Sequence, residues 1–428
     1  MEYLWTKEIQ MPQFPTLDAD RKTDVLIIGG GMAGVLCALQ MHKMGADYLL
    51  VEGKRIGLGI TKGTTAVISA QHSTLYQDVL KRLGKNRAAS YLHANLHAVE
   101  ELCTLAKEFD CELERCPSIL YSVNDAQKMQ HEVRILRDLG YEAEFTTQIP
   151  LPVEIAGAVK FPDMAQFHPL KFLRGAVKNL NILENTFVMD LDGTTAVTGH
   201  GKIEAKKVIV CTHFPFINRR GMFFIKLSQK RSYVIALENA PRLGVTLEED
   251  SESGLYFRNY RNLLLIGGGD RRTGEKDGFS FARNFANLYF PDAKEVYAWA
   301  NQDCVSLDQL PYIGRYGTMD DVYVATGFNH WGMSTSMMAS RLLCDLVLGR
   351  KPCPDLTSHR DIFTKQFWGN VGTTAKNFAT PTTKRCPHMG CAMKWNETEQ
   401  SWDCPCHGSR FDANGRLIDN PAMRDLNC

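Results

Sequence analysis

The chain has 428 residues, of which 44% are hydrophobic and 23% charged, which is typical of an ordinary folded protein and excludes a disordered or fibrous one. This length exceeds what one hydrophobic core usually serves, so two or three domains are expected. Lys and Arg together number 49 and Asp and Glu 48, a balance that argues against nucleic acid or an anionic membrane as the main partner.

Residues 1–22 are polar and lack a basic segment followed by an apolar one. The most hydrophobic stretch, 25–39, is interrupted by glycines and is too short to span a bilayer. We therefore expect a cytoplasmic protein without a membrane span. Eight of the thirteen cysteines are scattered through the first 360 residues, as buried small side chains would be, whereas the other five follow residue 385.

A strand is predicted over 24–28, a helix from the following glycines to Gly45, and a second strand over 48–52. The turn between the first strand and the helix fits G-x-G-x-x-G, whose glycines let the backbone approach a pyrophosphate at a helix N-terminus. An acidic residue at the end of the second strand is placed to accept from ribose hydroxyls. The predicted dinucleotide site, for FAD or NAD, comprises Gly29, Gly31, Met32, Ala33, Gly34 and Glu52.

Further along the chain, helices are predicted over 81–109 and 126–139, the second of them stopped by Gly140. Short alternating strands are predicted over 182–210 and 223–269. A strand, a glycine turn and a helix follow over 312–349. From Trp368 to Lys384 the composition shifts to Gly, Thr, Asn and Pro, which predicts a linker.

A second Gly/Thr-rich loop, 54–66, resembles the flavin-side loop of the D-amino-acid oxidase superfamily, which includes glycine and sarcosine oxidases. Residues 208–212 resemble that family's apolar strand beside the cofactor, and 302–314 with 324–332 resemble its C-terminal flavin segment. The resemblance spans residues 24–350 and implies FAD in preference to NAD. It adds to the cofactor site the residues Thr61, Thr64, Thr65, Ala66, Val188, Gly327, Gly332, Met333 and Ser334.

The same resemblance implies that FAD takes a hydride from a carbon bearing an amine, while side chains hold the substrate. The catalytic candidates are Arg258 and Tyr233, on strands of the substrate region, and His330, in the loop expected to cross the flavin. The alternatives are a surface salt bridge, a core hydroxyl and a structural histidine, respectively. Met333 stands where some relatives carry a carboxylate-binding lysine, which argues against an ordinary amino-acid substrate. Cys304 lies near the position where sarcosine oxidases bond to the flavin, with a buried free thiol as the alternative.

The C-terminal cysteines form a C-x-H pair and, fifteen residues later, a C-x-x-H pair. Two Cys and two His could hold a structural zinc, but the first spacing is tighter than in common zinc sites. A Rieske centre needs one Cys and one His from each of two loops, and the flanking residues resemble the two Rieske cluster loops. The predicted ligands are Cys386, His388, Cys404 and His407. The resemblance also implies a disulfide between Cys391 and Cys406. The short segment before the first loop implies a reduced module that leans on the flavin body.

The expected fold is α/β and α+β: a doubly wound, Rossmann-like FAD-binding domain, an antiparallel-sheet substrate domain and a small β-rich Rieske cluster module. We expect the FAD-binding domain in three parts, 1–80, 166–217 and 301–365. The substrate domain is expected in two parts, 81–165 and 218–300. A linker, 366–384, then leads to the cluster-binding module, 385–428.

These features predict an FAD-dependent oxidoreductase, a dehydrogenase that oxidises a small amine or amino-acid-like substrate. Single electrons would pass through the [2Fe–2S] cluster to a redox partner protein or a small acceptor, and flow in the reverse direction is equally allowed. The alternatives are a non-catalytic electron-transfer or redox-sensing flavoprotein and a simple FAD oxidase with a structural metal module. The sequence leaves the substrate, the oligomeric state and covalent flavin attachment undefined.

Overall fold

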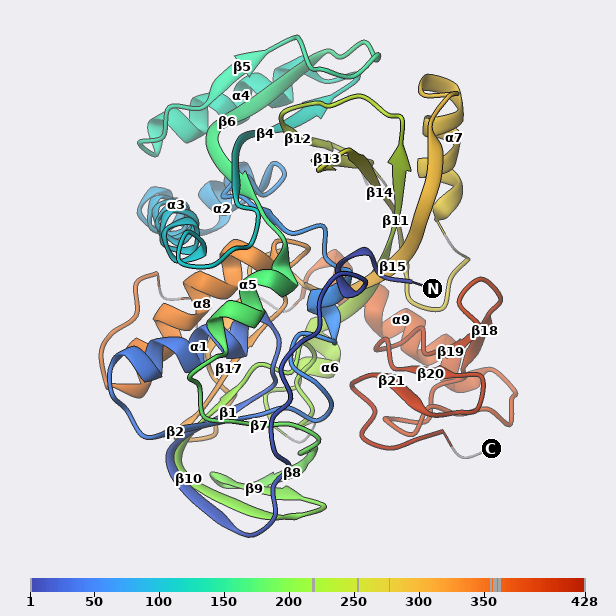
Figure 1. Cartoon of the computed structure of the whole chain (residues 1–428). Coiled ribbons are helices and arrows are strands. Elements are labelled where there is room, and N and C mark those ends of the chain that lie inside the picture. The colour runs from blue at the N-terminus through green and yellow to red at the C-terminus, as the bar shows by residue number, and fades with distance from the viewer. Residues whose placement is uncertain are drawn as a thin grey trace.

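The computed structural model describes residues 2–426 except 218–219, 252–253, 277, 355, 357–359 and 361–362. Its strands form three sheets (Figure 1). Two large sheets make the body, and a small sheet near the C-terminus lies beside it at the lower right of the view. This arrangement confirms the predicted fold class of a doubly wound domain, an antiparallel substrate-side sheet and a small β-rich module.

The first sheet is built around the glycine motif and is mainly parallel. Strand β1 pairs in parallel with β2 and β10, and β10 pairs in parallel with β17, as crossover connections require. The strands are β16 (Tyr312–Arg315), β17 (Val322–Thr326), β10 (Gly201–Val210), β1 (Arg21–Ile28), β2 (Tyr48–Val51) and β7 (Ile182–Leu183) in spatial order, with β8 (Val188–Asp192) and β9 (Thr195–Thr198) beyond β10. Three separate stretches of chain therefore build one cofactor-binding sheet.

The second sheet covers the substrate side and is antiparallel except where β12 meets β4. Its strands in spatial order are β15 (Lys294–Ser306), β11 (Leu227–Glu238), β14 (Leu263–Arg272), β13 (Tyr256–Tyr260), β12 (Thr246–Glu249), β4 (Glu114–Ser122), β6 (Gly157–Gln166) and β3 (Val67–Ile68), with β5 (Glu144–Thr146) beside β6. The third sheet is wholly antiparallel and comprises β18 (Lys394–Asn396), β19 (Ser401–Asp403), β20 (Arg410–Asp412) and β21 (Leu417–Asp419).

Helices cover the sheets and separate the module from the body. Helices α1, α8 and α3 lie together on one side of the first sheet, and α9 lies between the body and the third sheet (Figure 1). The helices are α1 (Met32–Lys43), α2 (Leu75–Leu83), α3 (Lys85–Ala106), α4 (Ala126–Asp138), α5 (Pro169–Ala176), α6 (Phe223–Lys226), α7 (Phe279–Tyr289), α8 (Gly332–Val347) and α9 (Lys365–Ala379). Two short 3-10 helices cover Leu4–Thr6 and Ile60–Gly63.

Two helix predictions differ from the structure in an informative way. The helix predicted over 81–109 is confirmed by α3 over Lys85–Ala106, but its first residues belong to the end of α2, because Gly84 has φ +80° and separates the two helices. The segment predicted as a linker is largely helical, since α9 covers Lys365–Ala379. Its start is fixed by Thr364, whose side chain accepts a hydrogen bond from the amide of Phe367. The prediction of a helix over 126–139 is confirmed by α4.

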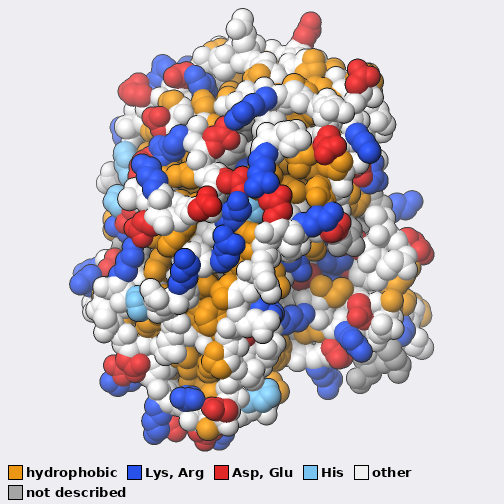
Figure 2. Space-filling view, in the orientation of Figure 1, with side chains coloured by type: hydrophobic (Ala, Val, Ile, Leu, Met, Phe, Trp, Pro, Cys, Tyr) orange, Lys and Arg blue, Asp and Glu red, His pale blue; other side chains and the backbone are white. Residues whose placement is uncertain are grey.

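Acidic and basic side chains are interspersed over the face shown in Figure 2, in keeping with their nearly equal numbers. Among the residues that the structure describes, no helix is both long and apolar enough to cross a membrane.

Candidate functional site

The carboxyl end of β1 opens into a cavity of about 270 Å³ that is lined by the glycine motif. Glu52, at the end of β2, accepts hydrogen bonds from the backbone amides of Gly30 (2.7 Å) and Lys54 (2.8 Å). Burial raises the pKa of Glu52, although these two amide bonds oppose the shift. The carboxylate is thus fixed at the cavity wall, where the sequence placed a ribose-binding group.

Two glycines of the motif are required by close backbone approach. Gly29 has φ +109°, and a Cβ there would collide with the carbonyl oxygen of Cys211 at the end of β10. A Cβ at Gly34 would collide with the carbonyl oxygen of Gly29, so α1 can approach β1 only with glycine at this position. At Gly31, by contrast, a Cβ would meet only the Thr61 hydroxyl at 3.4 Å. The backbone of the motif is therefore open enough for a pyrophosphate group to approach it.

Most of the predicted cofactor residues lie on this cavity. Those that line it are Gly29, Gly31, Met32, Ala33, Glu52, Thr61, Thr64, Val188, Gly327, Gly332 and Met333. Thr65 lines a neighbouring cavity, while Gly34, Ala66 and Ser334 line neither of the two. Sequence reasoning missed the contribution of His213 and Phe216, which follow β10, and it left Cys304 as a candidate for covalent attachment; Cys304 lines the cavity.

A second cavity of about 560 Å³ adjoins the first on the side of the antiparallel sheet. The residues that line both cavities are Thr64, Asn301, Asp303, His330 and Met333. Any flavin ring bound in the first cavity would meet a ligand of the second at this junction. The second cavity is the candidate substrate site.

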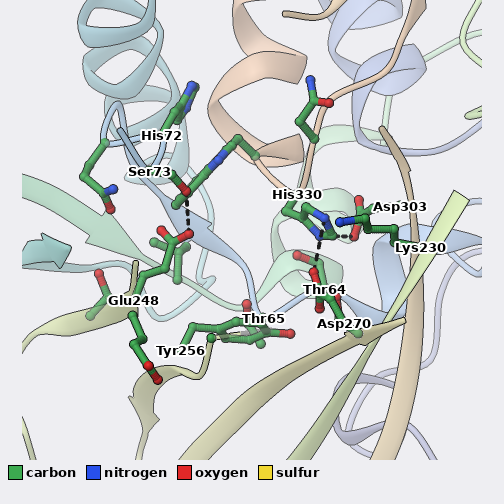
Figure 3. Close-up of a pocket in the computed structure, with 18 of the residues that line it drawn as sticks. Thr64, Thr65, His72, Ser73, Lys230, Glu248, Tyr256, Asp270, Asp303 and His330 are labelled. Carbon is green, nitrogen blue, oxygen red and sulfur yellow. Dashed lines mark hydrogen bonds and ion pairs between the residues drawn. The ribbon is translucent and has the colours of Figure 1, made fainter. Parts of the chain in front are cut away.

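His330 stands at the junction, where Asp270 and Asp303 each lie 3.4 Å from one of its ring nitrogens (Figure 3). Burial disfavours the charged imidazole, but these two carboxylates outweigh it and raise the pKa of His330 to about 9. Its backbone lies in the left-handed region, with φ +73°. The preceding Asn329 fixes that loop, since its side chain bonds to Ser306, Gln309 and Gly327. The ring is therefore held as an imidazolium at neutral pH.

The other two catalytic candidates are placed differently. The Arg258 guanidinium donates to the backbone carbonyls of Thr65, Ala66 and Phe167, so its donors are largely occupied although the residue borders the substrate cavity. Tyr233 is buried and packs edge-on against Phe279, in a hydrophobic cluster away from both cavities. The structure brings His330 to the junction and leaves these two in supporting positions.

Several cavity residues were missed from the sequence, namely Lys230, Ser232, Glu248, Tyr256, Asp270 and Asp303. Strand alternation explains part of this. On β11, Lys230 and Ser232 face the cavity, whereas Arg231 and Tyr233 face the other side. The alternation is visible in the sequence, but the choice of face depends on which elements cover each side.

The two C-terminal motif loops bring the predicted cluster ligands together. Cys386 and Cys404 are buried, and the rings of His388 and His407 lie 4.8 Å apart, nearly perpendicular. The Nδ1 atom of His407 is shielded from solvent and has no hydrogen-bond partner within the described part of the chain. Two thiols and two imidazoles, one with an unsatisfied ring nitrogen, fit the donor set of a Rieske centre. These four residues could hold the cluster.

The disulfide implied by the resemblance is absent from the described residues, where Cys391 and Cys406 are both free. Their sulfur atoms nevertheless lie within 4.8 Å of each other and of the Cys404 sulfur. The spacing brings the extra cysteines together as the resemblance implied, without the covalent bond.

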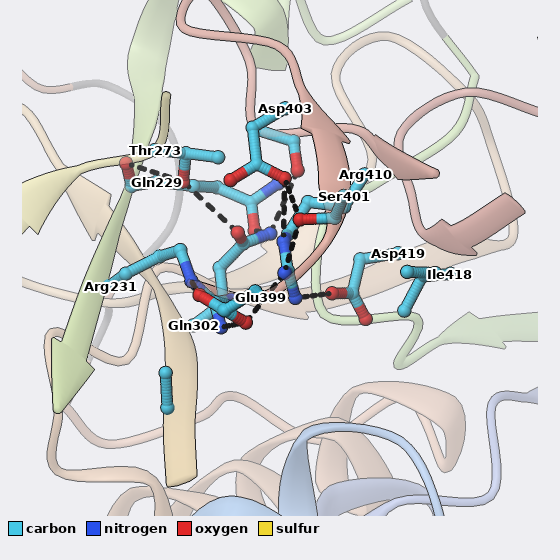
Figure 4. Close-up of polar contacts among 12 residues, drawn as sticks. Gln229, Arg231, Thr273, Gln302, Glu399, Ser401, Asp403, Arg410, Ile418 and Asp419 are labelled. Carbon is cyan, nitrogen blue, oxygen red and sulfur yellow. Dashed lines mark hydrogen bonds and ion pairs between the residues drawn. The ribbon is translucent and has the colours of Figure 1, made fainter. Parts of the chain in front are cut away.

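The cluster module is fixed to the body through a buried ionic network (Figure 4). Arg231 of β11 pairs with Glu399, and both side chains are almost completely buried. Glu399 and Asp403 in turn accept from Arg410, at 2.6 and 2.9 Å. Gln229 donates to the carbonyl of His407 at 2.7 Å, which ties the body directly to a cluster loop. The sequence predicted that the module depends on the flavin body, and these contacts are what hold it there.

The module also forms part of the cofactor cavity. Leu417, Ile418, Asp419, Asn420 and Met423 line it together with the glycine motif. Lys54 donates to the carbonyls of Leu417 and Ile418, at 2.9 and 3.1 Å. Asn420 donates to the carbonyls of Thr212 and Phe214, each at 2.7 Å. Residues 417–423 therefore form a common wall, which belongs to the cluster module and also bounds the FAD cavity.

Comparison with known proteins agrees with this geometry. The family model described as FAD dependent oxidoreductase matches residues 24–346, and the model described as Rieske [2Fe-2S] domain matches residues 371–428. The Bacillus subtilis (strain 168) protein YhfW, named as a Rieske 2Fe-2S iron-sulfur protein, is 30% identical over 99% of this chain and 97% of its own. The Escherichia coli (strain K12) gamma-glutamylputrescine oxidoreductase is 23% identical over 78% of this chain and 86% of its own.

Solved structures share the fold of the body. Glycine oxidase from Geobacillus kaustophilus superimposes with a TM-score of 0.68 at 20% identity, covering 80% of this chain and 99% of its own. L-proline dehydrogenase from P. horikoshii gives 0.67 at 19% identity, with 78% and 96% covered. These structures confirm the fold, while the two family models and the match to YhfW confirm the predicted resemblance, the oxidoreductase class and both cofactors, FAD and the [2Fe–2S] cluster.

Proposed function

Because the chain belongs to the FAD dependent oxidoreductase family and ends in a Rieske [2Fe–2S] domain, we propose that it is a dehydrogenase of small amines or amino-acid-like molecules. When bound, FAD supplies a hydride acceptor and the cluster a carrier of single electrons. Relatives named for glycine, proline and gamma-glutamylputrescine support a substrate with an amine. A cluster held by Cys386, His388, Cys404 and His407 would supply a one-electron route from the flavin to an external acceptor.

The observation that carries this proposal is the common wall of the two cofactor regions. Phe214, in the loop that follows β10, lies with its ring centroid 6.3 Å from that of His388 and 6.5 Å from that of His407. The same residue accepts from Asn420, which lines the FAD cavity. If the module had a role unrelated to the flavin, its two histidines would have no reason to face the flavin body, and its residues would have no reason to line the FAD cavity.

His330 and Lys230 are the groups we assign to the substrate. Both line the substrate cavity, and the ammonium of Lys230 has no ion pair with any described residue, so it is available to an anionic group of a ligand. The His330 imidazolium is fixed at the junction, where it orients the reacting end of the substrate. We propose Cys386, His388, Cys404 and His407 as the cluster ligands.

The test is an anaerobic reduction of the purified holoprotein with a panel of amines and amino acids. We expect the flavin absorbance to bleach and the electron paramagnetic resonance signal of a reduced [2Fe–2S] centre to follow. A one-electron acceptor such as ferricyanide should then support faster turnover than oxygen. Reduction of the flavin by substrate with a cluster that stays oxidised, and rapid stoichiometric peroxide formation in air, would contradict the proposal.

A further inference from the structure

One wall of the substrate cavity carries polar atoms that lack partners. Thr246 Oγ1 is shielded from solvent and has no hydrogen-bond partner among the residues that the structure describes, and within the same residues Gln71 Nε2 and Glu248 Oε2 form no hydrogen bond of ordinary geometry, although the Gln71 side chain is close enough to lower the pKa of Glu248. Gln71 and Thr246 are 1% and 3% exposed, and all three residues line the cavity. Leaving a buried polar atom unsatisfied is costly, so three of them on one wall indicate that a ligand completes their bonding.

The carboxylate on this wall has no cation in direct contact among the described residues. Ser73 donates to Glu248 Oε1 at 2.7 Å, but within the described ranges Glu248 forms no ion pair. Asp270 and Asp303, by contrast, share the imidazolium of His330. Burial raises the pKa of Glu248 to about 7, and the hydrogen bond from Ser73 and the more distant His330 imidazolium oppose this shift without cancelling it. A cationic group of the ligand would supply the missing charge.

The wall lies away from the cofactor. None of Gln71, Thr246 and Glu248 lines the FAD cavity, whereas His330 and Asp303 line both cavities. Figure 3 shows Glu248 and Ser73 on one side of the substrate cavity and His330, Asp303 and Lys230 on the other. A ligand that reaches both sides therefore presents its reacting carbon at the junction and another group at Glu248.

We propose that the substrate carries a second cationic group, several bonds from the carbon that is oxidised, and that Glu248 binds this group with Gln71 and Thr246. Basic amino acids and diamines both carry such a group, and a basic amino acid also has the carboxylate that Lys230 can bind. The inference rests on the proposed function, because it takes the reacting amine to lie at the flavin junction.

Matched probes test the subsite. L-Ornithine is compared with L-norleucine, and 1,4-diaminobutane with 1-aminopentane, because in each pair a methyl group replaces the second ammonium. Two readouts are measured, the apparent dissociation constant from anaerobic flavin bleaching and the ligand-induced shift in thermal midpoint. We expect at least one cationic probe to bind the wild-type holoprotein about tenfold more tightly than its neutral partner. The Glu248→Gln variant should reduce this preference to about twofold or less.

Asp250→Asn is the matched control, since Asp250 is paired with Lys128 at 2.7 Å and lines neither cavity. It should keep the preference. Flavin bleaching by amines without a preference, or a preference that survives in Glu248→Gln, would overturn the subsite and leave the proposed function standing. A Glu248-dependent thermal shift without bleaching by any probe would instead overturn the proposed function. The subsite is also overturned if neither cationic probe binds.

Discussion

The imidazole of His330 lies between two carboxylates at the junction of the cofactor cavity and the substrate cavity. A buried histidine without such neighbours would be neutral, and His72, in the same cavity, is an example, because burial lowers its pKa to about 3. The two histidines therefore carry opposite protonation states at neutral pH. The charged ring of His330 therefore lies at the junction with the cofactor cavity, and the neutral ring of His72 lies in the part of the substrate cavity away from it.

We predict that Asp270→Asn lowers the pH at which the His330 charge is lost. In the wild type the imidazolium persists until the pH rises through about 9. Without one of its two carboxylates, its pKa should fall by about one unit or more. The measurement is the pH dependence of the rate constant for anaerobic flavin reduction. The alkaline limb should move to lower pH in Asp270→Asn and vanish in His330→Gln, and an unchanged limb would show that another group sets it.

At this scale the sequence was informative for backbone motifs and poor for side-chain roles. The glycine turn and Glu52 could be predicted because their chemistry depends on local spacing. The roles of Arg258 and Tyr233 could not be predicted from the sequence. The donors of Arg258, for example, are occupied by carbonyls from residues 65, 66 and 167, which are far away in sequence. Long-range partners of that kind leave no local pattern.

At the scale of elements, β11 connects the two halves of the proposed function. One face presents Lys230 and Ser232 to the substrate cavity, and the other presents Arg231 to Glu399 of the cluster module. Lys230 faces the cavity, whereas Arg231 is almost completely buried, so the charge of Arg231 needs a partner within the protein. The ion pair between Arg231 and Glu399 therefore contributes to holding the module against this face of β11.

We predict that Arg231→Met destabilises the docked module. Removing one member of a buried ion pair leaves the other charge uncompensated, which costs up to about 3–5 kcal/mol, although Arg410 still contacts Glu399. The measurement is urea-induced unfolding of the holoprotein, followed by the visible absorbance of the cluster. The matched control is Arg242→Met, whose pair with Glu114 is 73% and 40% exposed and should contribute less than about 1 kcal/mol.

A double-mutant cycle with Glu399→Gln separates the ion pair from general disturbance. Because the two side chains contact each other, the double variant should lose less free energy of unfolding than the sum of the single variants. Additive losses would mean that Arg231 stabilises the protein through other contacts.

At the scale of the whole molecule, the fold class could be predicted but the assembly could not. The period of the apolar residues and the glycine turns indicated a doubly wound sheet, and the cysteine loops indicated the module. Nothing in the spacing of residues 386–407 indicated that the segment after them, 417–423, would line the FAD cavity. That contact depends on the docking of one domain on another, which the local sequence does not encode.

The common wall makes cofactor retention cooperative, so loss of the cluster should weaken the binding of FAD. The cluster loops are short and have a small core, and such modules depend on their metal for folding. In Cys404→Ser we therefore expect residues 417–423 to be displaced from the cavity, because the third sheet that carries β21 loses its cluster. The FAD content per chain after gel filtration should fall well below that of the wild type. Cys353→Ser is the matched control, since Cys353 is exposed and lies outside the module. An unchanged FAD content in Cys404→Ser would show that the body alone holds the flavin and that the common wall serves only to bring the two cofactors together.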